Sequence, residues 1–123
     1  NATGESVLAA LNLLDQLDKP RIAVLGEMYE LGDESEHQHR MVGCRAAGVA
    51  QHIVTLGPHA KWIAQEAVAC GAPAANVHQC TSHEQVLDVL ARLVTRKSVV
   101  LFKGSRGLEM EKIVKQFVVK GDE

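Results

Sequence analysis

The stretch that decides the fold is Ile22-Ala23-Val24-Leu25-Gly26-Glu27-Met28-Tyr29-Glu30-Leu31-Gly32. Its first four residues are uncharged and largely branched, which is typical of a strand buried on both faces of a parallel sheet. Gly26 lets the backbone turn sharply where that strand ends. The loop that follows carries two carboxylates, so we expect its polar groups to face a crevice at the edge of the sheet.

Amphipathic segments and apolar runs alternate along the rest of the chain. The spacing of apolar residues predicts a helix over 4–17 and another that ends near residue 49. Asp33 and Glu36 predict a capping box at the start of the second helix. Strands are expected at 21–25, 52–56, 76–80 and 98–102. This alternation predicts an α/β fold of three layers, in which helices cover both faces of a mostly parallel sheet.

Length and composition exclude several classes of function. A chain of 123 residues forms one domain whose core needs neither disulfides nor metal. The formal net charge of -2 and an aromatic content of 3% argue against sequence-independent binding to nucleic acid or to an acidic membrane. No apolar stretch approaches the roughly 20 residues that span a bilayer, and no signal peptide is recognisable. We therefore expect a cytoplasmic protein.

The three cysteines, Cys44, Cys70 and Cys80, are far apart in the sequence and form no Cys-x-x-Cys pair. We expect reduced, partly buried thiols that act as small apolar residues. The chain begins at Asn1 rather than at methionine and opens almost at once into a helix. Because such a helix usually follows a strand in an alternating α/β chain, we expect a fragment of a longer protein.

A second polar loop follows the last predicted strand. Lys103-Gly104-Ser105-Arg106-Gly107 places two cations, a hydroxyl group and two glycines just before a predicted helix. Backbone N–H groups, the helix dipole and the cations favour an anion such as a phosphate or a carboxylate. The alternative is a glycine turn with two solvated cations. The loop is not a Walker A motif, and the Gly-x-Gly-x-x-Gly motif is absent as well.

Glu27, Glu30 and His39 are the candidate functional residues of the first loop and of the helix after it. The two carboxylates are suited to bind an ammonium group, to orient a basic residue or to approach a magnesium–nucleotide complex. The alternative is that they only keep the loop solvated. His39 lies on the apolar stripe of its helix, where it either points toward the crevice or is a hydrogen-bonded histidine of the core.

The six histidines form no recognisable metal site. His37 and His39 are two residues apart on a predicted helix, so they point in nearly opposite directions. Neither a His-Glu-x-x-His motif nor a Gly-x-Ser-x-Gly elbow is present. The sequence therefore predicts neither a transition-metal site nor a serine hydrolase.

Two separated motifs resemble those of a known family. The stretch from Gly26 to Gly32, followed by Ser35 and His39, is similar to Gly-Asp-Met-x-Glu-Leu-Gly-x-x-Ser-x-x-x-His of the MurF family. The loop at Lys103, with Met110-Glu111, resembles that family's Lys-Gly-Ser-Arg-x-x-x-Met-Glu. The N-terminal Asn-Ala with the following helix resembles the end of its Asp-Ser-Tyr-Asn-Ala-Asn segment. MurF enzymes are UDP-N-acetylmuramoyl-tripeptide--D-alanyl-D-alanine ligases of peptidoglycan synthesis.

The resemblance implies that residues 1–123 form a Rossmann-like C-terminal domain, the third of three. In this family ATP and Mg2+, bound mainly by the central domain, convert the carboxylate of UDP-N-acetylmuramoyl-tripeptide into an acyl phosphate. The amine of D-alanyl-D-alanine then attacks that intermediate. The C-terminal domain positions the dipeptide and closes over ATP, so this domain alone is expected to be inactive. A monomer without nucleic-acid or membrane partners is expected.

The resemblance also implies roles for individual residues. The residues expected to bind phosphate or carboxylate are Lys103, Gly104, Ser105 and Arg106; those expected to line the dipeptide pocket or support its loop are Glu27, Glu30 and His39; those expected at the nucleotide edge are Asn1 and Thr3. Glu27 stands where the family usually has aspartate. Two rival hypotheses are a stand-alone α/β module that binds a nucleotide or anion without catalysis, and a structural interaction domain.

Overall fold

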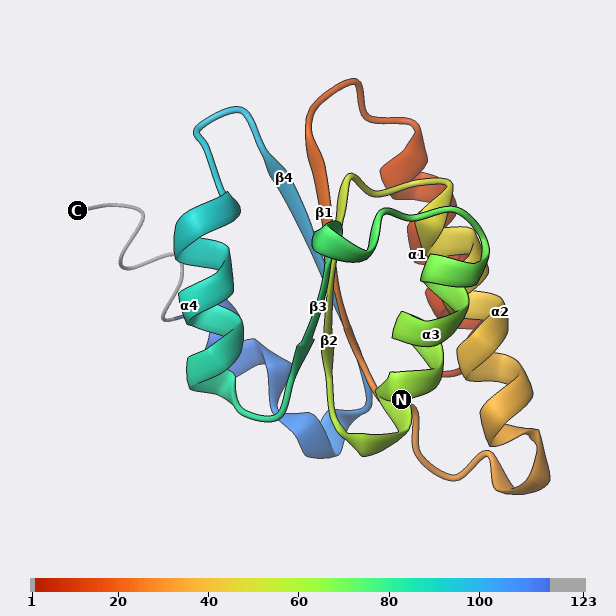
Figure 1. The fold of residues 1–123 in the computed structure, drawn as a ribbon. Coiled ribbons are helices and arrows are strands. Elements are labelled where there is room, and N and C mark those ends of the chain that lie inside the picture. Colours follow the sequence, from red (N-terminus) through yellow and green to blue (C-terminus); the bar gives the residue numbers. More distant parts are fainter. Residues whose placement is uncertain (1, 116–123) are drawn as a thin grey trace.

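The computed structural model describes residues 2–115 and confirms the predicted α/β class (Figure 1). Four parallel strands form one sheet in the order β3-β2-β1-β4. The strands are β1 (Arg21–Gly26), β2 (His52–Leu56), β3 (Val77–Cys80) and β4 (Val99–Lys103). Because β1 lies between β2 and β4, the loops that leave these three strands meet at one edge of the sheet.

The helices form a layer on each face of the sheet (Figure 1). On one face lie α1 (Gly4–Asp15), α2 (Ser35–Ala47) and α3 (Lys61–Ala69); on the other lies α4 (His83–Leu93). Short 3-10 turns join the elements: η1 (Gly32–Glu34), η2 (Pro58–Ala60), η3 (Ala74–Asn76) and η4 (Arg106–Leu108). Within residues 2–115, none of the helices has the length and apolar character needed to cross a membrane.

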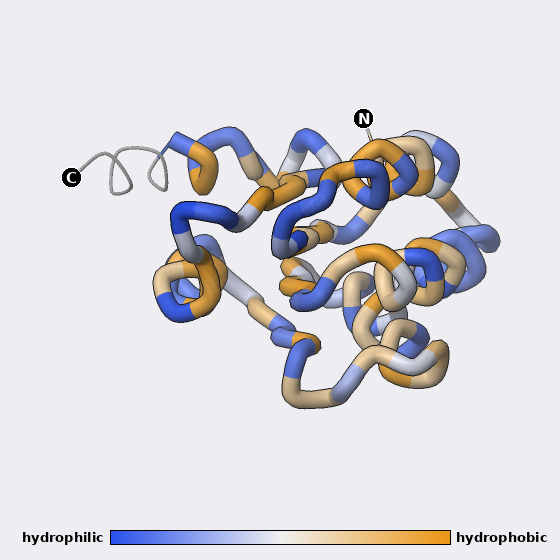
Figure 2. Tube along the Cα trace, turned by 90° about the horizontal axis from the view of Figure 1, so that it is seen from above, coloured by the Kyte–Doolittle hydropathy of each residue, from blue (hydrophilic) through white to orange (hydrophobic). Residues whose placement is uncertain are grey.

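β1 is buried on both faces, as its sequence predicts. Ala23 and Leu25 belong to the core cluster beneath α1, α2 and α3, whereas Ile22 and Val24 belong to the cluster beneath α4. The second cluster also contains Ile113, from the helical residues 110–115. The helices are amphipathic, and Figure 2 shows them as tubes that change between hydrophobic and hydrophilic within each turn.

Two details of the predicted elements are wrong. Asp33 does not cap the second helix, because residues 32–34 already form the 3-10 turn η1, and α2 begins at Ser35 without a side-chain cap. The last strand lies one residue later than predicted, so Lys103 is its final residue and pairs in register with Leu25 of β1. The polar loop after β4 therefore begins at Gly104.

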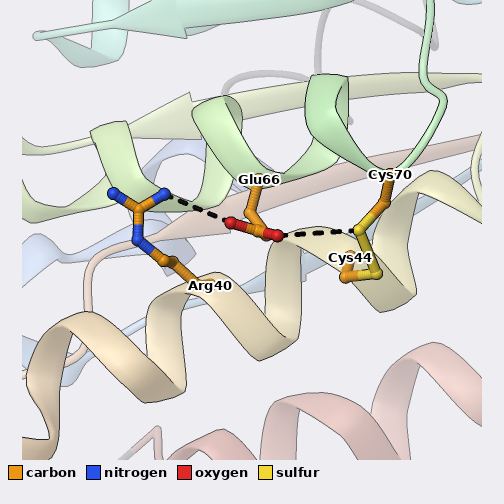
Figure 3. Close-up of a disulfide and its surroundings, with 4 residues drawn as sticks. All are labelled: Arg40, Cys44, Glu66 and Cys70. Carbon is orange, nitrogen blue, oxygen red and sulfur yellow. Dashed lines mark hydrogen bonds and ion pairs between the residues drawn. A yellow bond between two sulfur atoms is a disulfide. The ribbon is translucent and has the colours of Figure 1, made fainter.

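The prediction of three reduced thiols is wrong for Cys44 and Cys70, which form a disulfide between α2 and the end of α3 (Figure 3). Their Cα atoms are 5.2 Å apart, which is within the ordinary range for a disulfide. The two helices pack so closely that the two distant cysteines become neighbours. Glu66 lies beside the disulfide and forms an ion pair of 3.2 Å with Arg40 (Figure 3). Cys80 is a buried free thiol, as predicted.

Candidate functional site

The two polar loops predicted from the sequence lie side by side at the carboxyl ends of β1 and β4. A Cβ atom at Gly104 would lie 3.0 Å from the Cα atom of Gly26, so the two backbones approach too closely for larger residues. The Ser105 N–H donates a hydrogen bond to the Glu27 carbonyl oxygen at 3.2 Å. The Tyr29 N–H donates to the Ser105 hydroxyl oxygen at 2.7 Å. These bonds make the two loops one unit.

Two cations flank Ser105 in the second loop. The Ser105 side chain is 1% exposed, because its hydroxyl group joins the two loops. Lys103 is half-buried at the end of β4, and Arg106 is exposed at the first position of η4. Within residues 2–115 the Lys103 ammonium group forms no ion pair, so its charge is available to an anion. The arrangement fits the predicted anion loop, with Ser105 as a structural link.

Glu27 is a buried carboxylate, only 6% exposed, that reaches from the β1 loop to the start of the next helix. Its Oε2 atom accepts a hydrogen bond from the His59 backbone N–H at 2.8 Å and lies 3.5 Å from His59 Nδ1. The side chain passes over Gly57, where a Cβ atom would lie 2.7 Å from the carboxyl carbon. Gly57 also has a φ of 108°, a backbone conformation that favours glycine.

His39 is fully buried and supports the first loop. Its Nε2 atom accepts a hydrogen bond from the Met28 N–H at 2.9 Å, so the ring proton is on Nδ1, which donates to the Ser35 carbonyl oxygen at 2.6 Å. Burial lowers the pKa of His39, and the bond to Ser35 opposes this shift only in part. Of the two predicted roles for His39, this geometry favours loop support by a neutral imidazole.

A pocket of about 310 Å³ opens beside the first loop. Its lining comes from the loop, the start of α2 and the η2–α3 segment, and consists of Met28, Tyr29, Glu30, Leu31, Gly32, Ser35, His59 and Trp62. Trp62 stacks on His59, with ring centroids 5.5 Å apart and planes 18° from parallel. Glu30 adopts a left-handed backbone conformation with a φ of 62°. The pocket combines an aromatic wall with an acidic group and has no Lys or Arg in its lining.

Tyr29 connects this pocket to the anion loop. Partial burial and the neighbouring Glu27 carboxylate raise the pKa of Tyr29. The tyrosine ring lies against Gly107, where a Cβ atom would be 2.7 Å from a ring carbon. The phenol therefore stays protonated, and Gly107 leaves room for it.

Comparison with known proteins assigns the chain to a family. The family model described as "Mur ligase, glutamate ligase domain" matches residues 1–106. The chain belongs to the Mur ligase family. It is 30% identical over 121 residues to the UDP-N-acetylmuramoyl-tripeptide--D-alanyl-D-alanine ligase of Bacillus subtilis, with 96% of this chain and 26% of the relative covered. The corresponding Haemophilus influenzae ligase is 32% identical over 120 residues, with 93% of this chain and 25% of the relative covered.

Solved structures of Mur ligases have the same fold. A crystal structure of MurF from Acinetobacter baumannii has a TM-score of 0.82 and 29% identity, covering 95% of this chain and 26% of that one. MurF ligase from Thermotoga maritima in complex with ADP has a TM-score of 0.79 and 28% identity, with the same coverage. The chain thus spans about a quarter of the length of these relatives and is similar to the C-terminal domain of MurF.

Of the remaining predicted residues of the Mur ligase domain, Thr3 is the one that the structure describes, and it is not part of the lining of this pocket. Thr3 caps α1, because its side chain accepts from the Ser6 N–H at 3.2 Å while the Ser6 hydroxyl accepts from the Thr3 N–H at 2.9 Å. Asn1 lies outside the described residues. Residues 2–115 contain no group of three or more His, Cys, Asp or Glu side chains that could hold a metal ion. Roles for Thr3 and Asn1 at the nucleotide stay predictions.

His59 and Trp62 are site residues that the sequence analysis missed. Both belong to the segment after β2, and they reach the pocket because β2 lies next to β1 in the sheet. Trp62 is the single tryptophan of a chain with 3% aromatic residues, and it follows the carboxyl end of a predicted strand. That position and its rarity were the signals available in the sequence.

Proposed function

We propose that this Mur ligase domain positions D-alanyl-D-alanine for an ATP-dependent amide ligase that extends UDP-N-acetylmuramoyl-tripeptide in peptidoglycan synthesis. The observation that carries the proposal is the similarity to ligases of that name over 93% or more of this chain. The joined loops at the carboxyl ends of β1 and β4 support it, since ligands of open parallel sheets bind at that edge. We also propose that the full-length protein acts in the cytoplasm as a monomer.

The two loops bind different parts of the dipeptide. Lys103 and Arg106 supply positive charge for the dipeptide carboxylate or for the phosphate of the activated peptide. Ser105 and the two facing glycines hold the loops together so that these charges keep their positions. The pocket beside Glu30 and Trp62 accommodates the small apolar side chains of the acceptor. Domain closure then excludes water from the acyl phosphate.

The described residues fit the phosphates of ATP better than its magnesium ion. The cations and backbone N–H groups of the 103–106 loop suit phosphate oxygens. Mg2+ prefers several oxygen ligands, but the Glu27 carboxylate already accepts a hydrogen bond from His59, and residues 2–115 bring no group of carboxylates together. We therefore expect Mg2+ and most of ATP to bind to the central domain of the full-length enzyme.

Alanine substitutions of the two cations test this proposal in the full-length parent enzyme. Lys103→Ala and Arg106→Ala are each expected to lower kcat/KM for D-alanyl-D-alanine by roughly 30-fold, which corresponds to about 2 kcal/mol. Arg96→Ala and Lys97→Ala are matched controls, because these exposed cations precede β4 at the opposite edge of the sheet. Unchanged kcat/KM in both loop variants would remove the anion-loop assignment.

A further inference from the structure

Glu27 and His59 form a carboxylate–imidazole pair, of which His59 lines the pocket. The Glu27 side chain is 8% exposed, whereas the His59 side chain is 54% exposed. The His59 backbone N–H fixes the position of Glu27 Oε2 at 2.8 Å, and the same oxygen lies 3.5 Å from Nδ1 of the ring. A buried acceptor beside Nδ1 favours the tautomer with the proton on Nδ1, which leaves the Nε2 lone pair unprotonated.

The stacked Trp62 ring and the Gly57 backbone shape the surroundings of the pair. Trp62 stacks on the His59 ring at 5.5 Å, so the imidazole cannot swing freely away from the pocket that it lines. Gly57 gives the Glu27 side chain the space to pass beneath the ring. Within residues 2–115, no hydrogen-bond partner is found for His59 Nε2. The titratable groups around the ring are Glu27, Tyr29 and Glu30 of the loop, His39 of α2 and Lys61 of α3.

Resting on the proposed function, we propose that His59 is the general base that deprotonates the incoming amine, with Glu27 as its positioning residue. An α-ammonium group has a pKa of about 8, so most of the acceptor arrives protonated at neutral pH and cannot attack. His59 Nε2 takes one proton from the ammonium group, and the Glu27 carboxylate stabilises the resulting imidazolium. His59 later returns this proton to solvent.

The step that follows balances without another reactant. The neutral amine attacks the carbonyl carbon of the acyl phosphate, a C–N bond forms, and the C–O bond to phosphate breaks. The second proton of the amine leaves with the phosphate, which departs as hydrogen phosphate. The base therefore removes only the first proton. Loss of the His59 imidazole is expected to slow the reaction of acceptors that arrive protonated and to leave the reaction of unprotonated acceptors unchanged.

Glu27 is one methylene longer than the aspartate of the MurF motif that this loop resembles. From the end of β1 its carboxylate crosses to η2, the turn that carries His59. The extra methylene of glutamate provides this reach over Gly57.

The test uses two nucleophiles in the full-length parent enzyme, at saturating concentration of each. His59→Gln is expected to lower kcat with D-alanyl-D-alanine at pH 7 by about 10-fold, because only about one tenth of an amine with a pKa near 8 is unprotonated at that pH and able to attack without a base. Hydroxylamine, which is largely unprotonated at this pH, traps the acyl phosphate without a base, so its rate should change less than about 3-fold in the variant. His37→Gln is the matched control, because His37 is an exposed histidine outside the pocket.

The pH profile separates a base from a binding residue. In the His59→Gln variant, kcat with the dipeptide should rise about 10-fold per pH unit up to about pH 8, where the amine deprotonates by itself. In the unmodified enzyme, kcat with the dipeptide should rise much less steeply over this pH range, because His59 accepts the proton of the ammonium group. Glu27→Gln alone should lower kcat with the dipeptide. When it is combined with His59→Gln, it should cause no further loss of kcat.

Three results would overturn the inference. One is dipeptide turnover in His59→Gln within about 3-fold of the unmodified enzyme. Another is an equal loss with both nucleophiles, which would make His59 a structural residue. The third is a loss that persists at pH 9. Absence of dipeptide-dependent turnover in the unmodified parent would instead overturn the proposed function, so the two failures are distinguishable.

Discussion

Reduction of the Cys44–Cys70 disulfide is expected to lower the free energy of unfolding of this domain by about 3.5 kcal/mol. The two cysteines are 26 residues apart, and closing a loop of that length removes about 12 cal/mol/K of entropy from the unfolded chain. For a domain of this size, such a loss lowers Tm by roughly 10–20 °C. Both cysteines are exposed, so a reductant reaches the disulfide in the folded protein.

The assay is urea unfolding of the chain, followed by circular dichroism, with and without a reductant. The double variant Cys44→Ser, Cys70→Ser is the control: it should match the reduced protein and should not respond to the reductant. Cys80 is buried and is not part of the disulfide, so it stays unchanged throughout. An unfolding midpoint that does not move on reduction, or two reactive thiols in the oxidised folded protein, would refute the pairing and the entropy argument built on it.

Two further predictions concern stability. Gly43→Ala should cost about 1–3 kcal/mol in urea unfolding, because a Cβ atom at Gly43 would lie 3.0 Å from the Ile63 carbonyl carbon of α3. Gly48→Ala should be nearly neutral, because a Cβ atom there would make only ordinary contacts, the nearest being the Arg45 carbonyl oxygen at 3.6 Å. The free energy of unfolding should also fall as pH drops below about 6.5. Burial lowers the pKa of His39 and His78 in the folded protein, so the unfolded chain binds protons first. His39→Gln should flatten the dependence of the free energy of unfolding on pH, and an unchanged dependence would contradict the role given to His39.

The sequence was sufficient for the elements and their class, because β1, β2 and β4 are short, largely apolar runs bounded by Gly, Pro or polar residues. The strand order was not predictable, since the periodicity of single strands does not say which of them are neighbours. The disulfide was missed for the same reason: Cys44 and Cys70 meet only because α2 and α3 pack side by side. The capping box failed because a 3-10 turn over 32–34 begins the helical backbone before Asp33 can cap it.

The meeting of the two polar loops in the candidate site was predictable, because parallel strands bring the loops at their carboxyl ends together. This places Glu27 and Ser105 next to each other, as the 3.2 Å bond between their backbones shows. The sequence also left two roles open for His39, and the hydrogen bond with Met28 favours the supporting one. His59 could not be assigned, because its importance depends on the adjacency of β1 and β2 and on a carboxylate 32 residues away.

The proposed function makes this domain part of a dipeptide-adding ligase. The most direct measurement is ATP-dependent phosphate release by the full-length parent protein given UDP-N-acetylmuramoyl-tripeptide, with and without D-alanyl-D-alanine. We predict sustained phosphate release only with the dipeptide, together with formation of the UDP-N-acetylmuramoyl-pentapeptide. A well-folded parent that releases no phosphate with the dipeptide present, or that releases it equally without the dipeptide and forms no pentapeptide, would contradict the account.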